Sequence, residues 1–349
     1  MPKNRVCLKQ IGGNRMYEII QAPMAGGNAT PALVHAVAQA GGFGYLAGGY
    51  KTVAALKEEI HSLRALGTDY FGVNLFVPAQ PNGQTALTKN YCEKLAIEAE
   101  LIDTTIGDYA YSDDEWSAKF QLMLDEKVPV VSFTFNMPTP AHVLQLKKAG
   151  IQTVQTVTSV EEAQQAEKLG VDEVCVQGIE AGGHRASFDD RDPVETPPLA
   201  QLVKDVVAAI DIPVIAAGGM MDGASIREVL DAGARAAQLG TAFLCCPESG
   251  TKPTHIKALL DGHFTTTALT RAYTGRLARG LENDFMLRYN DAPQAYPELH
   301  YVTQPLRKKA GELDRPDLLA MWAGENFSAI RVLSATELVS LLKKEANLL

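Results

Sequence analysis

Short hydrophobic runs alternate with longer amphipathic stretches along most of this chain. A brief apolar or β-branched run that ends in glycine, proline or a polar cluster indicates a buried β-strand. Most of these runs are followed by a segment with helical features, so the pattern predicts strand–helix units and a parallel sheet. The predicted strands are Ile19–Met24, Phe43–Ala47, Tyr70–Val77, Val128–Phe135, Thr153–Val157, Glu173–Gln177, Pro213–Ala217 and Ala236–Gly240.

N-cap residues mark where several of the helices begin. Some of these candidates precede a proline, the residue favoured at the first helical position, and others have a glutamate three residues later, which is the spacing of a capping box. The predicted N-caps are Thr30 and Thr139, each before proline; Ser159 and Ser334, with Glu162 and Glu337 three residues on; and Thr52 and Asp222.

Eight strand–helix units in 349 residues favour a (β/α)8 TIM barrel of the α/β class over an open doubly wound sheet. No Gly-x-Gly-x-x-Gly follows the first strand, which weakens the dinucleotide-binding alternative. Two long segments, 78–126 and 246–327, interrupt the alternation. We expect a barrel of residues 1–245 and 328–349, closed by the helix after Ser334, and a smaller inserted lid or substrate subdomain at 246–327.

Composition narrows the functional classes. Hydrophobic residues make up 46% of the chain, enough for a large core. The net charge of −9, without a lysine or arginine run, argues against nucleic-acid or membrane partners. No signal-peptide segment opens the chain, so we expect a soluble cytoplasmic protein, a monomer or small homo-oligomer. The odd number of cysteines, without a C-x-x-C pair, predicts reduced thiols at Cys7, Cys92, Cys175, Cys245 and Cys246.

Polar and glycine residues gather at the predicted C-terminal ends of the strands, where a barrel places its active site. The sixth strand leads into a glycine-rich loop that we expect to be flexible and to approach a ligand closely. Its histidine is the one side chain there that titrates near neutral pH; the alternative is a surface residue after an ordinary turn. The residues at these ends are Ala22-Pro23-Met24, Asn74, Gln177, Gly182-Gly183-His184, Gly218-Gly219 and Gly240-Thr241.

The ends of the seventh and eighth strands have the composition of a phosphate site. Loops at these positions of many barrels bind phosphate through backbone N–H groups, and Thr241 adds a hydroxyl. The alternative is that the glycines only turn the chain or relieve crowding. With a phosphate held there, Asn74 and Gln177 face the barrel mouth and can hydrogen-bond a flat heterocycle lying on Pro23-Met24. FMN, with one phosphate and one ring system, fits this arrangement.

Several segments resemble the nitronate monooxygenases, formerly called 2-nitropropane dioxygenases, and they span nearly the whole chain. They are Gln21–Gly27, Gly72–Leu75, Gln177–His184, Ile215–Gly219, Gln238–Thr241, Thr274–Asn283 and Trp322–Gly324. The resemblance implies an FMN-containing TIM barrel that detoxifies alkyl nitronates, such as propionate 3-nitronate, by converting them with O2 to carbonyl compounds and nitrite. The FMN contacts that it implies are Ala22, Pro23, Met24, Asn74, Gln177, Gly182, Gly183, Gly218, Gly219, Gly240 and Thr241.

The same resemblance places His184 over the flavin as the catalytic residue. It would meet the anionic nitronate as an imidazolium, or act as a base towards a neutral nitroalkane. Tyr296 and Tyr301 are candidate substrate hydroxyls, with ordinary packing as the alternative, and Tyr109 and Tyr111 are further candidates. Arg276 and Arg279 are left open between a phosphate contact, a brace for the lid and surface ion pairs.

Two other enzymes and one non-enzymatic function compete with this assignment. A flavin-dependent enoyl-acyl-carrier-protein reductase or an NAD(P)H:quinone reductase resembles the same barrel, and a flavin-binding scaffold protein is the third. The Gly-Gly-His-Arg continuation, Ala295-Tyr-Pro297 and Trp322–Gly324 look more like the monooxygenase. The other histidines show no metal-ligand spacing and receive no role: His35, His61, His142, His255, His263 and His300.

Overall fold

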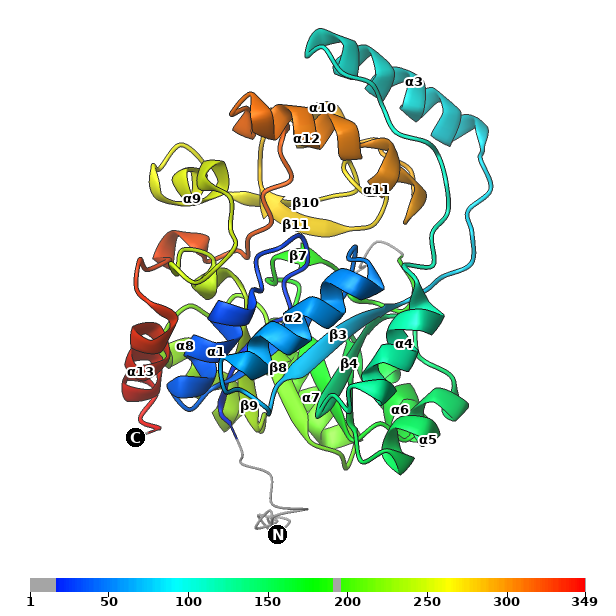
Figure 1. Ribbon diagram of the computed structural model, residues 1–349. Helices are drawn as coiled ribbons and strands as arrows, with labels where there is room; N and C mark the ends of the chain where they lie inside the picture. Colours follow the sequence, from blue (N-terminus) through cyan, green and yellow to red (C-terminus); the bar gives the residue numbers. More distant parts are fainter. Residues whose placement is uncertain (1–16, 191–195, 349) are drawn as a thin grey trace.

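Eight parallel strands close into a barrel in the computed structural model, which describes residues 17–190 and 196–348. Strands that are consecutive around the barrel are hydrogen-bonded, and β1 completes the ring by pairing with β9 (Figure 1). The predicted TIM barrel is therefore confirmed. Its strands are β1 Ile19–Gln21, β2 Phe43–Ala47, β3 Gly72–Val77, β4 Val130–Phe135, β5 Gln152–Val157, β6 Glu173–Gln177, β8 Val214–Ala217 and β9 Ala236–Leu239.

Helices connect these strands and surround the barrel (Figure 1). All six predicted N-cap side chains accept a hydrogen bond from the backbone N–H three residues later. The capping box at Ser159 is incomplete, because the Glu162 carboxylate accepts instead from Thr158 and from the backbone of Phe188. The barrel helices are α1 Pro31–Gln39, α2 Val53–Ala65, α4 Trp116–Asp125, α5 Pro140–Lys148, α6 Val160–Leu169, α7 Leu199–Ala209, α8 Gly223–Asp231 and α13 Ala335–Glu345.

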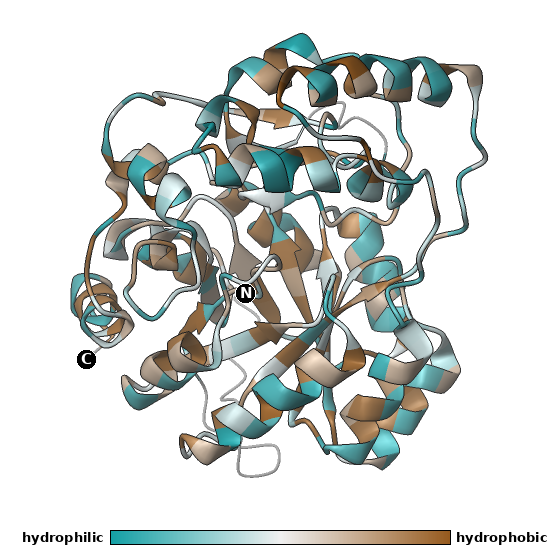
Figure 2. Cartoon of the chain, turned by 45° about the horizontal axis from the view of Figure 1, so that its top comes forward, coloured by the Kyte–Doolittle hydropathy of each residue, from teal (hydrophilic) through white to brown (hydrophobic). Residues whose placement is uncertain are grey.

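The alternation of side chains along the strands decides what points into the barrel. One hydrophobic cluster contains strand residues such as Ile20, Tyr45 and Ile215 but no residue of a helix, and it fills the interior. The neighbouring strand positions pack outward against the helices, and the strands in Figure 2 are largely hydrophobic. Because successive side chains alternate, Asn74 and Gln177 fall on the inner face.

A second layer covers the C-terminal mouth of the barrel (Figure 1). Its small antiparallel sheet has the order β10-β11-β7, so the glycine–histidine pair after β6 joins the layer built by the later insertion. The elements of this layer are β7 Gly183–His184, η1 Thr241–Phe243, α9 Pro253–Leu260, β10 Thr267–Thr270, β11 Ala278–Leu281, α10 Asp284–Arg288, α11 Glu298–Val302, α12 Gln304–Glu312, η2 Pro316–Leu318 and η3 Phe327–Ala329.

The earlier insertion also contributes to this layer. Its helix α3, Ala86–Leu101, shares a hydrophobic cluster with residues of the later insertion; Tyr91 and Leu95 pack there with Tyr273 and Phe285. The Tyr91 hydroxyl donates to the carbonyl oxygen of Ala272 at 2.7 Å. Two segments that lie far apart in the sequence therefore form one core above the barrel.

Two expectations concern the chain as a whole. Among the described residues, no helix is long and apolar enough to span a membrane. Cys92, Cys175, Cys245 and Cys246 are free thiols, as predicted, and Cys7 lies outside the described residues.

Candidate active site

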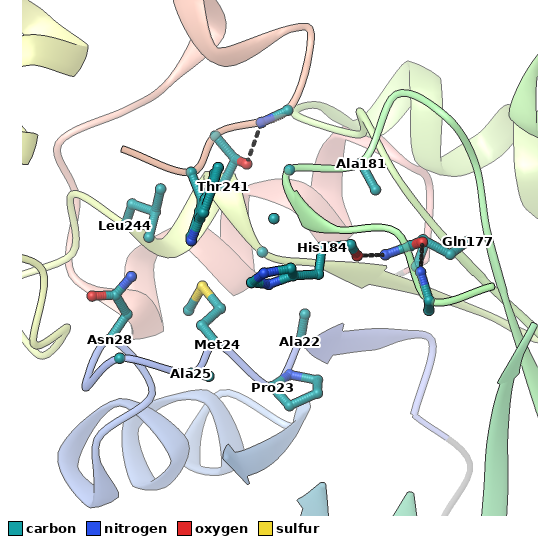
Figure 3. A pocket seen from close by; sticks show the side chains of 18 of the residues that line it. Ala22, Pro23, Met24, Ala25, Asn28, Gln177, Ala181, His184, Thr241 and Leu244 are labelled. Atoms are coloured by element: carbon teal, nitrogen blue, oxygen red, sulfur yellow. Dashed lines mark hydrogen bonds between the residues drawn. The ribbon is translucent and has the colours of Figure 1, made fainter. Parts of the chain in front are cut away.

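A cavity of about 390 Å³ lies at the C-terminal ends of the barrel strands. This volume is within the range of small-molecule and cofactor sites, roughly 300–1,000 Å³. Residues from the ends of β1, β3, β6, β8 and β9 meet there with residues of the covering layer (Figure 3). The structure brings together His184 and all the residues expected to contact a cofactor: Ala22, Pro23, Met24, Asn74, Gln177, Gly182, Gly183, Gly218, Gly219, Gly240 and Thr241.

The loop that carries His184 is held in place, which corrects the expectation of a flexible loop. Gly183 and His184 pair with Arg279 and Ala278 of β11. The Gln177 side chain donates to the carbonyl oxygen of His184 at 3.0 Å and accepts from the backbone N–H of Ala186 at 2.9 Å (Figure 3). Both ends of the Gln177 amide therefore bond to the loop, so this side chain fixes the position of His184 from below.

Gly182 is required by close packing rather than by its backbone conformation. A β-carbon at this position would meet the carbonyl carbon of Ala323 at 2.5 Å and the nitrogen of Gly324 at 2.6 Å. Gly183, in contrast, has a positive φ of 79°, which glycine adopts without strain. The two glycines thus let the loop turn and let the segment 322–326, near the end of the later insertion, pass directly over it.

This later segment also reaches the two predicted phosphate loops. The backbone N–H of Gly324 donates to Thr241 Oγ1 at 2.9 Å, and the Asn326 side chain donates to the carbonyl oxygen of Gly219 at 2.8 Å. The Thr241 hydroxyl accepts this hydrogen bond, which leaves its own O–H available to donate (Figure 3). Both the Thr241 hydroxyl and the backbone N–H groups of the two loops can therefore donate to a ligand.

The two glycine loops have the features of an anion cradle. Gly218 and Gly219 have positive φ values of 132° and 64°. A β-carbon on Gly240 would touch nothing nearer than 3.7 Å, so the space beside it is open. The backbone N–H groups of Gly219, Gly240 and Thr241 have no hydrogen-bond acceptor within residues 17–190 and 196–348. Because buried N–H groups are normally paired, these donors fit a bound phosphate.

Asn74 is oriented by the neighbouring strand. Its side-chain nitrogen donates to Ser132 Oγ and to Thr134 Oγ1, each at 2.9 Å, and the residue is 3% exposed. The amide oxygen therefore points away from β4. Met24 and Pro23 form an apolar part of the same cavity lining (Figure 3), so the lining can hold both the apolar face and the hydrogen-bonding edge of a flat ring system.

His184 lies in an aromatic enclosure. Its ring centroid is 5.4 Å from that of Trp322, 5.7 Å from Tyr296 and 6.0 Å from Phe135. Burial, together with the positive charges of Arg276 and Arg307, lowers the pKa of His184 to about 3. His184 is therefore neutral at physiological pH, so of the two forms that the sequence left open the imidazolium is disfavoured.

One hydrogen bond orients the His184 ring. Its Nε2 lies 2.9 Å from Thr274 Oγ1. The Thr274 hydroxyl lies 3.2 Å from the carbonyl oxygen of Arg276 and donates to it. When the hydroxyl proton is used in this way, Nε2 carries the imidazole proton and Nδ1 is left as the basic nitrogen.

The tyrosines named from the sequence lie beside this cavity and not in its lining. Tyr296 and Tyr301 line a neighbouring small cavity of about 20 Å³. Tyr296 still contacts the site, because its hydroxyl lies 3.0 Å from that of Tyr50, which lines both cavities. Tyr109 and Tyr111 are absent from both linings; Tyr111 bonds instead to the carbonyl oxygen of Ala79.

Arg276 and Arg279 brace the covering layer against the His184 loop. Arg276 Nε donates to the carbonyl oxygen of Arg185 at 3.1 Å, and its guanidinium lies 4.1 Å from the centre of the Phe135 ring. Arg279 donates to the carbonyl oxygen of Ile179 and forms a 2.8 Å ion pair with Glu325. Neither side chain lines the cavity, so of the options left open the bracing role is the one that the geometry supports.

Several cavity residues were missed by sequence reasoning because they come from unrelated parts of the chain. Tyr50 and His300 stack with parallel rings 4.0 Å apart, and Arg307 contacts His300. His255 is 9% exposed, and its Nε2 has no hydrogen-bond partner. His255 and His300 both line the cavity, so the absence of metal-ligand spacing was a poor reason to assign no role to them. The missed residues include Tyr50, Lys252, His255, Thr274, His300, Arg307 and Trp322.

The cavity has a charge balance opposite to that of the whole chain. The chain carries a net charge of −9. Lys252 and Arg307 line the cavity, whereas no aspartate or glutamate does so in the part of the chain that the structure describes. A cavity with this lining is suited to anionic ligands.

Comparison with known proteins shows the family of the chain. A family model described as nitronate monooxygenase matches residues 10–345. A probable nitronate monooxygenase of Staphylococcus aureus is 35% identical over 342 residues, which cover 95% of this chain and 94% of the relative. Another, from Staphylococcus saprophyticus, is 37% identical and covers 96% of each chain.

Solved structures show the same likeness. The crystal structure of nitroalkane oxidase from Streptomyces ansochromogenes matches with a TM-score of 0.90 and 45% identity, covering 95% of this chain and 96% of that one. FabK from Thermotoga maritima matches with a TM-score of 0.70 at 24% identity, covering 95% and 93%, and shares the fold. The resemblance drawn from the sequence motifs is confirmed: the chain belongs to the nitronate monooxygenase family, a family of oxidoreductases.

Proposed function

We propose that this protein is an FMN-dependent nitronate monooxygenase that converts alkyl nitronates and O2 to carbonyl compounds and nitrite. One observation carries the proposal: a single cavity combines a neutral histidine with glycine loops whose backbone donors find no acceptor among the described residues, and no carboxylate from that part of the chain lines it. Such a lining suits two anions together, a cofactor phosphate and a nitronate. Membership of the family supplies the type of reaction.

The residues of the cavity fit FMN in a defined order. The backbone N–H groups of Gly219, Gly240 and Thr241 would hold the phosphate. The amide oxygen of Asn74 would accept from an N–H group of the ring system, which would lie against Met24. When bound, FMN supplies the capacity to accept electrons from the nitronate and to pass them to oxygen.

In this proposal His184 is a base and an orienting group. Thr274 holds the proton on Nε2, so Nδ1 is available to take the α-proton of a neutral nitroalkane and so generate the nitronate within the site. A nitronate that arrives already ionised does not need this step. The aromatic rings around His184 exclude water from the reacting atoms.

The experiment that tests the proposal identifies both the cofactor and the products. The purified protein is denatured, the released flavin is identified by mass, and nitrite is measured after the intact protein is mixed with ethyl nitronate or propionate 3-nitronate in air. We expect FMN, and nitrite that forms only when oxygen is present. A protein that cannot be loaded with FMN, or a loaded protein that forms no nitrite from either nitronate, would refute the proposal.

A further inference from the structure

Arg307 is a cation on the cavity wall with no anionic partner. It lies on α12, and its N–H groups donate only to neutral acceptors: Thr303 Oγ1 at 3.1 Å and the carbonyl oxygen of His300 at 2.8 Å, with His300 Nδ1 at 3.3 Å. No carboxylate lies within 4 Å of the guanidinium in the described residues. Its Nη1 amino group has no acceptor among those residues.

Arg307 differs in one respect from each of the arginines around it. Arg279 pairs with Glu325 at 2.8 Å, and Arg271 pairs with Asp190 at 3.4 Å. Arg276 and Arg185 also donate to carbonyl oxygens, but neither of them lines the cavity. The Arg307 side chain is partly accessible, but only as part of the cavity wall and not as a free surface group, and burial lowers the pKa of the guanidinium from its usual value. A desolvated cation without an anion is unfavourable, so a fold that keeps one on a cavity wall gains stability when an anion arrives.

Arg307 belongs to the His184 side of the cavity. It contacts His300, whose ring stacks on Tyr50, and the Tyr50 hydroxyl meets that of Tyr296 beside His184. Within the described residues, none of the hydrogen bonds of Arg307 reaches the predicted phosphate loops, and its positive charge is one of those that lower the pKa of His184. The anion that Arg307 attracts is therefore the one that reacts near His184 and not the cofactor phosphate.

Tyr50 is itself held in place for this arrangement. It has a positive φ of 64°, and its backbone N–H donates to Asp114 Oδ1 at 2.9 Å. The other carboxylate oxygen of Asp114 forms a 2.8 Å ion pair with the buried Lys119. This carboxylate from the earlier insertion thus positions the aromatic ring on which His300 stacks, and through His300 it supports Arg307.

We propose that Arg307 is the residue that binds the negatively charged oxygens of the nitronate and holds them within reach of His184. This inference rests on the proposed function for the identity of the anion. A neutral His184 carries no positive charge to pair with the negative charge of the nitronate. The Arg307 guanidinium supplies that positive charge. The same guanidinium stabilises the charge that develops on a nitro group as His184 removes the α-proton.

The test compares Arg307→Gln with Arg307→Lys, and with Lys308→Gln as a matched control that removes one exposed positive charge from the same helix. A hydrogen bond to a charged group contributes about 1.5–3 kcal/mol, or roughly 10- to 150-fold. With ethyl nitronate we expect Arg307→Gln to raise KM by about this factor. With neutral nitroethane we expect kcat to fall and KM to stay within about threefold, because the charge forms only during the reaction.

A second readout does not depend on turnover. Sodium nitrate carries a planar, oxygen-rich anion, and we expect it to raise the thermal unfolding midpoint of the wild-type protein above the value in sodium chloride at equal ionic strength. The rise should persist in Lys308→Gln, persist in part in Arg307→Lys and vanish in Arg307→Gln.

The two readouts separate this inference from the proposed function. Loss of the nitrate effect in Arg307→Gln supports the anion site even if the wild-type protein forms no nitrite. An Arg307→Gln variant that keeps the nitrate effect, or that handles ethyl nitronate like the wild type, overturns the inference. A merely structural role would change KM and kcat to the same extent with ethyl nitronate and with nitroethane. That result also overturns the inference.

Discussion

At the scale of single residues, the cavity controls the protonation of its own side chains. His184 is enclosed by Trp322, Tyr296 and Phe135 and faces two arginines, so its charged form is disfavoured. His255 is buried in the same cavity, and burial lowers its pKa to about 4. With these histidines neutral and no carboxylate in the lining among the described residues, Arg307 and Lys252 are the cations of the cavity wall.

Replacement of His184 tests its role as a base. We expect His184→Asn to retain flavin and to lose turnover of nitroethane by about 10²- to 10⁴-fold, the usual contribution of general base catalysis. Turnover of ethyl nitronate, which needs no proton removal, should fall much less. Steady-state kinetics on both substrates check this, with Thr274→Val as the companion variant that keeps the ring but removes its hydroxyl partner. Wild-type turnover of nitroethane in His184→Asn would remove the base from the mechanism.

The lowered pKa of His184 also predicts how stability depends on pH. An unfolded histidine titrates near 6.5, whereas in the folded protein the pKa is about 3. As the pH falls below about 6.5, His184 becomes protonated in the unfolded chain but stays neutral in the folded protein. The contribution of His184 to the free energy of unfolding is therefore fully present above pH 6.5 and is lost progressively down to about pH 3. Between pH 7 and pH 5 the loss is about 1–2 kcal/mol.

Denaturant unfolding of wild type and His184→Asn at both pH values measures this contribution. We expect the variant to lose about 1–2 kcal/mol less free energy of unfolding than the wild type on going from pH 7 to pH 5. An identical loss in the two proteins would show that His184 is not held neutral by the fold.

At the scale of secondary-structure elements, the short strand β7 links the chemistry to the covering layer. It pairs with β11, while Gln177 at the end of β6 bonds to the same segment from the barrel side. The position of His184 is therefore set by two elements that come from different parts of the chain. The segment that crosses Gly182 adds the third constraint.

Gly182→Ala tests that constraint. The new methyl group would collide with the backbone of Ala323 and Gly324, and overpacking of this kind costs about 1–3 kcal/mol. We expect a lower unfolding midpoint and weaker retention of flavin, measured by thermal unfolding and by the flavin content after dialysis. Gly311→Ala is the control, since a β-carbon there meets only Leu319 at 3.9 Å within a helix. Equal behaviour of the two variants would contradict the close packing at Gly182.

Helices and strands were predictable where the pattern that indicates them depends only on neighbouring residues. Strand periodicity and N-caps such as Thr139 and Asp222 depend on neighbouring residues, so all eight barrel strands and six caps agree with the structure. The strand at His184 was taken for a flexible loop, because its partner β11 lies nearly a hundred residues later. The complete capping box predicted at Ser159 is wrong because the Glu162 carboxylate accepts from the backbone N–H of Phe188, a residue outside the local sequence pattern.

At the scale of the whole molecule, two insertions build one cover over a barrel. The core that joins α3 to the later insertion means that the cover is connected to the barrel at two places in the sequence, between β3 and β4 and after β9. We propose that the barrel of residues 1–245 and 328–349 carries the cofactor and that the lid at 246–327 completes the substrate side, with α3 packed onto that lid.

The candidate site divides in the same way between what was predictable and what was not. Residues at strand ends, from Ala22 to Thr241, could be identified because barrel topology alone brings them together. Tyr50, His300 and Arg307 meet only through the packing of the cover, which no local pattern reports. Tyr296 and Tyr301 were chosen from the correct segment, but their side chains face the neighbouring small cavity.

The most direct measurement of the central claim is an anaerobic absorbance spectrum of the flavin-loaded protein, mixed with ethyl nitronate and, separately, with NADH and NADPH. We expect a rapid change in the flavin absorbance with the nitronate, its reversal when oxygen is admitted, and little response to either nicotinamide. Rapid bleaching by NADH or NADPH with no response to the nitronate would refute the proposed function and would assign the site to a reductase.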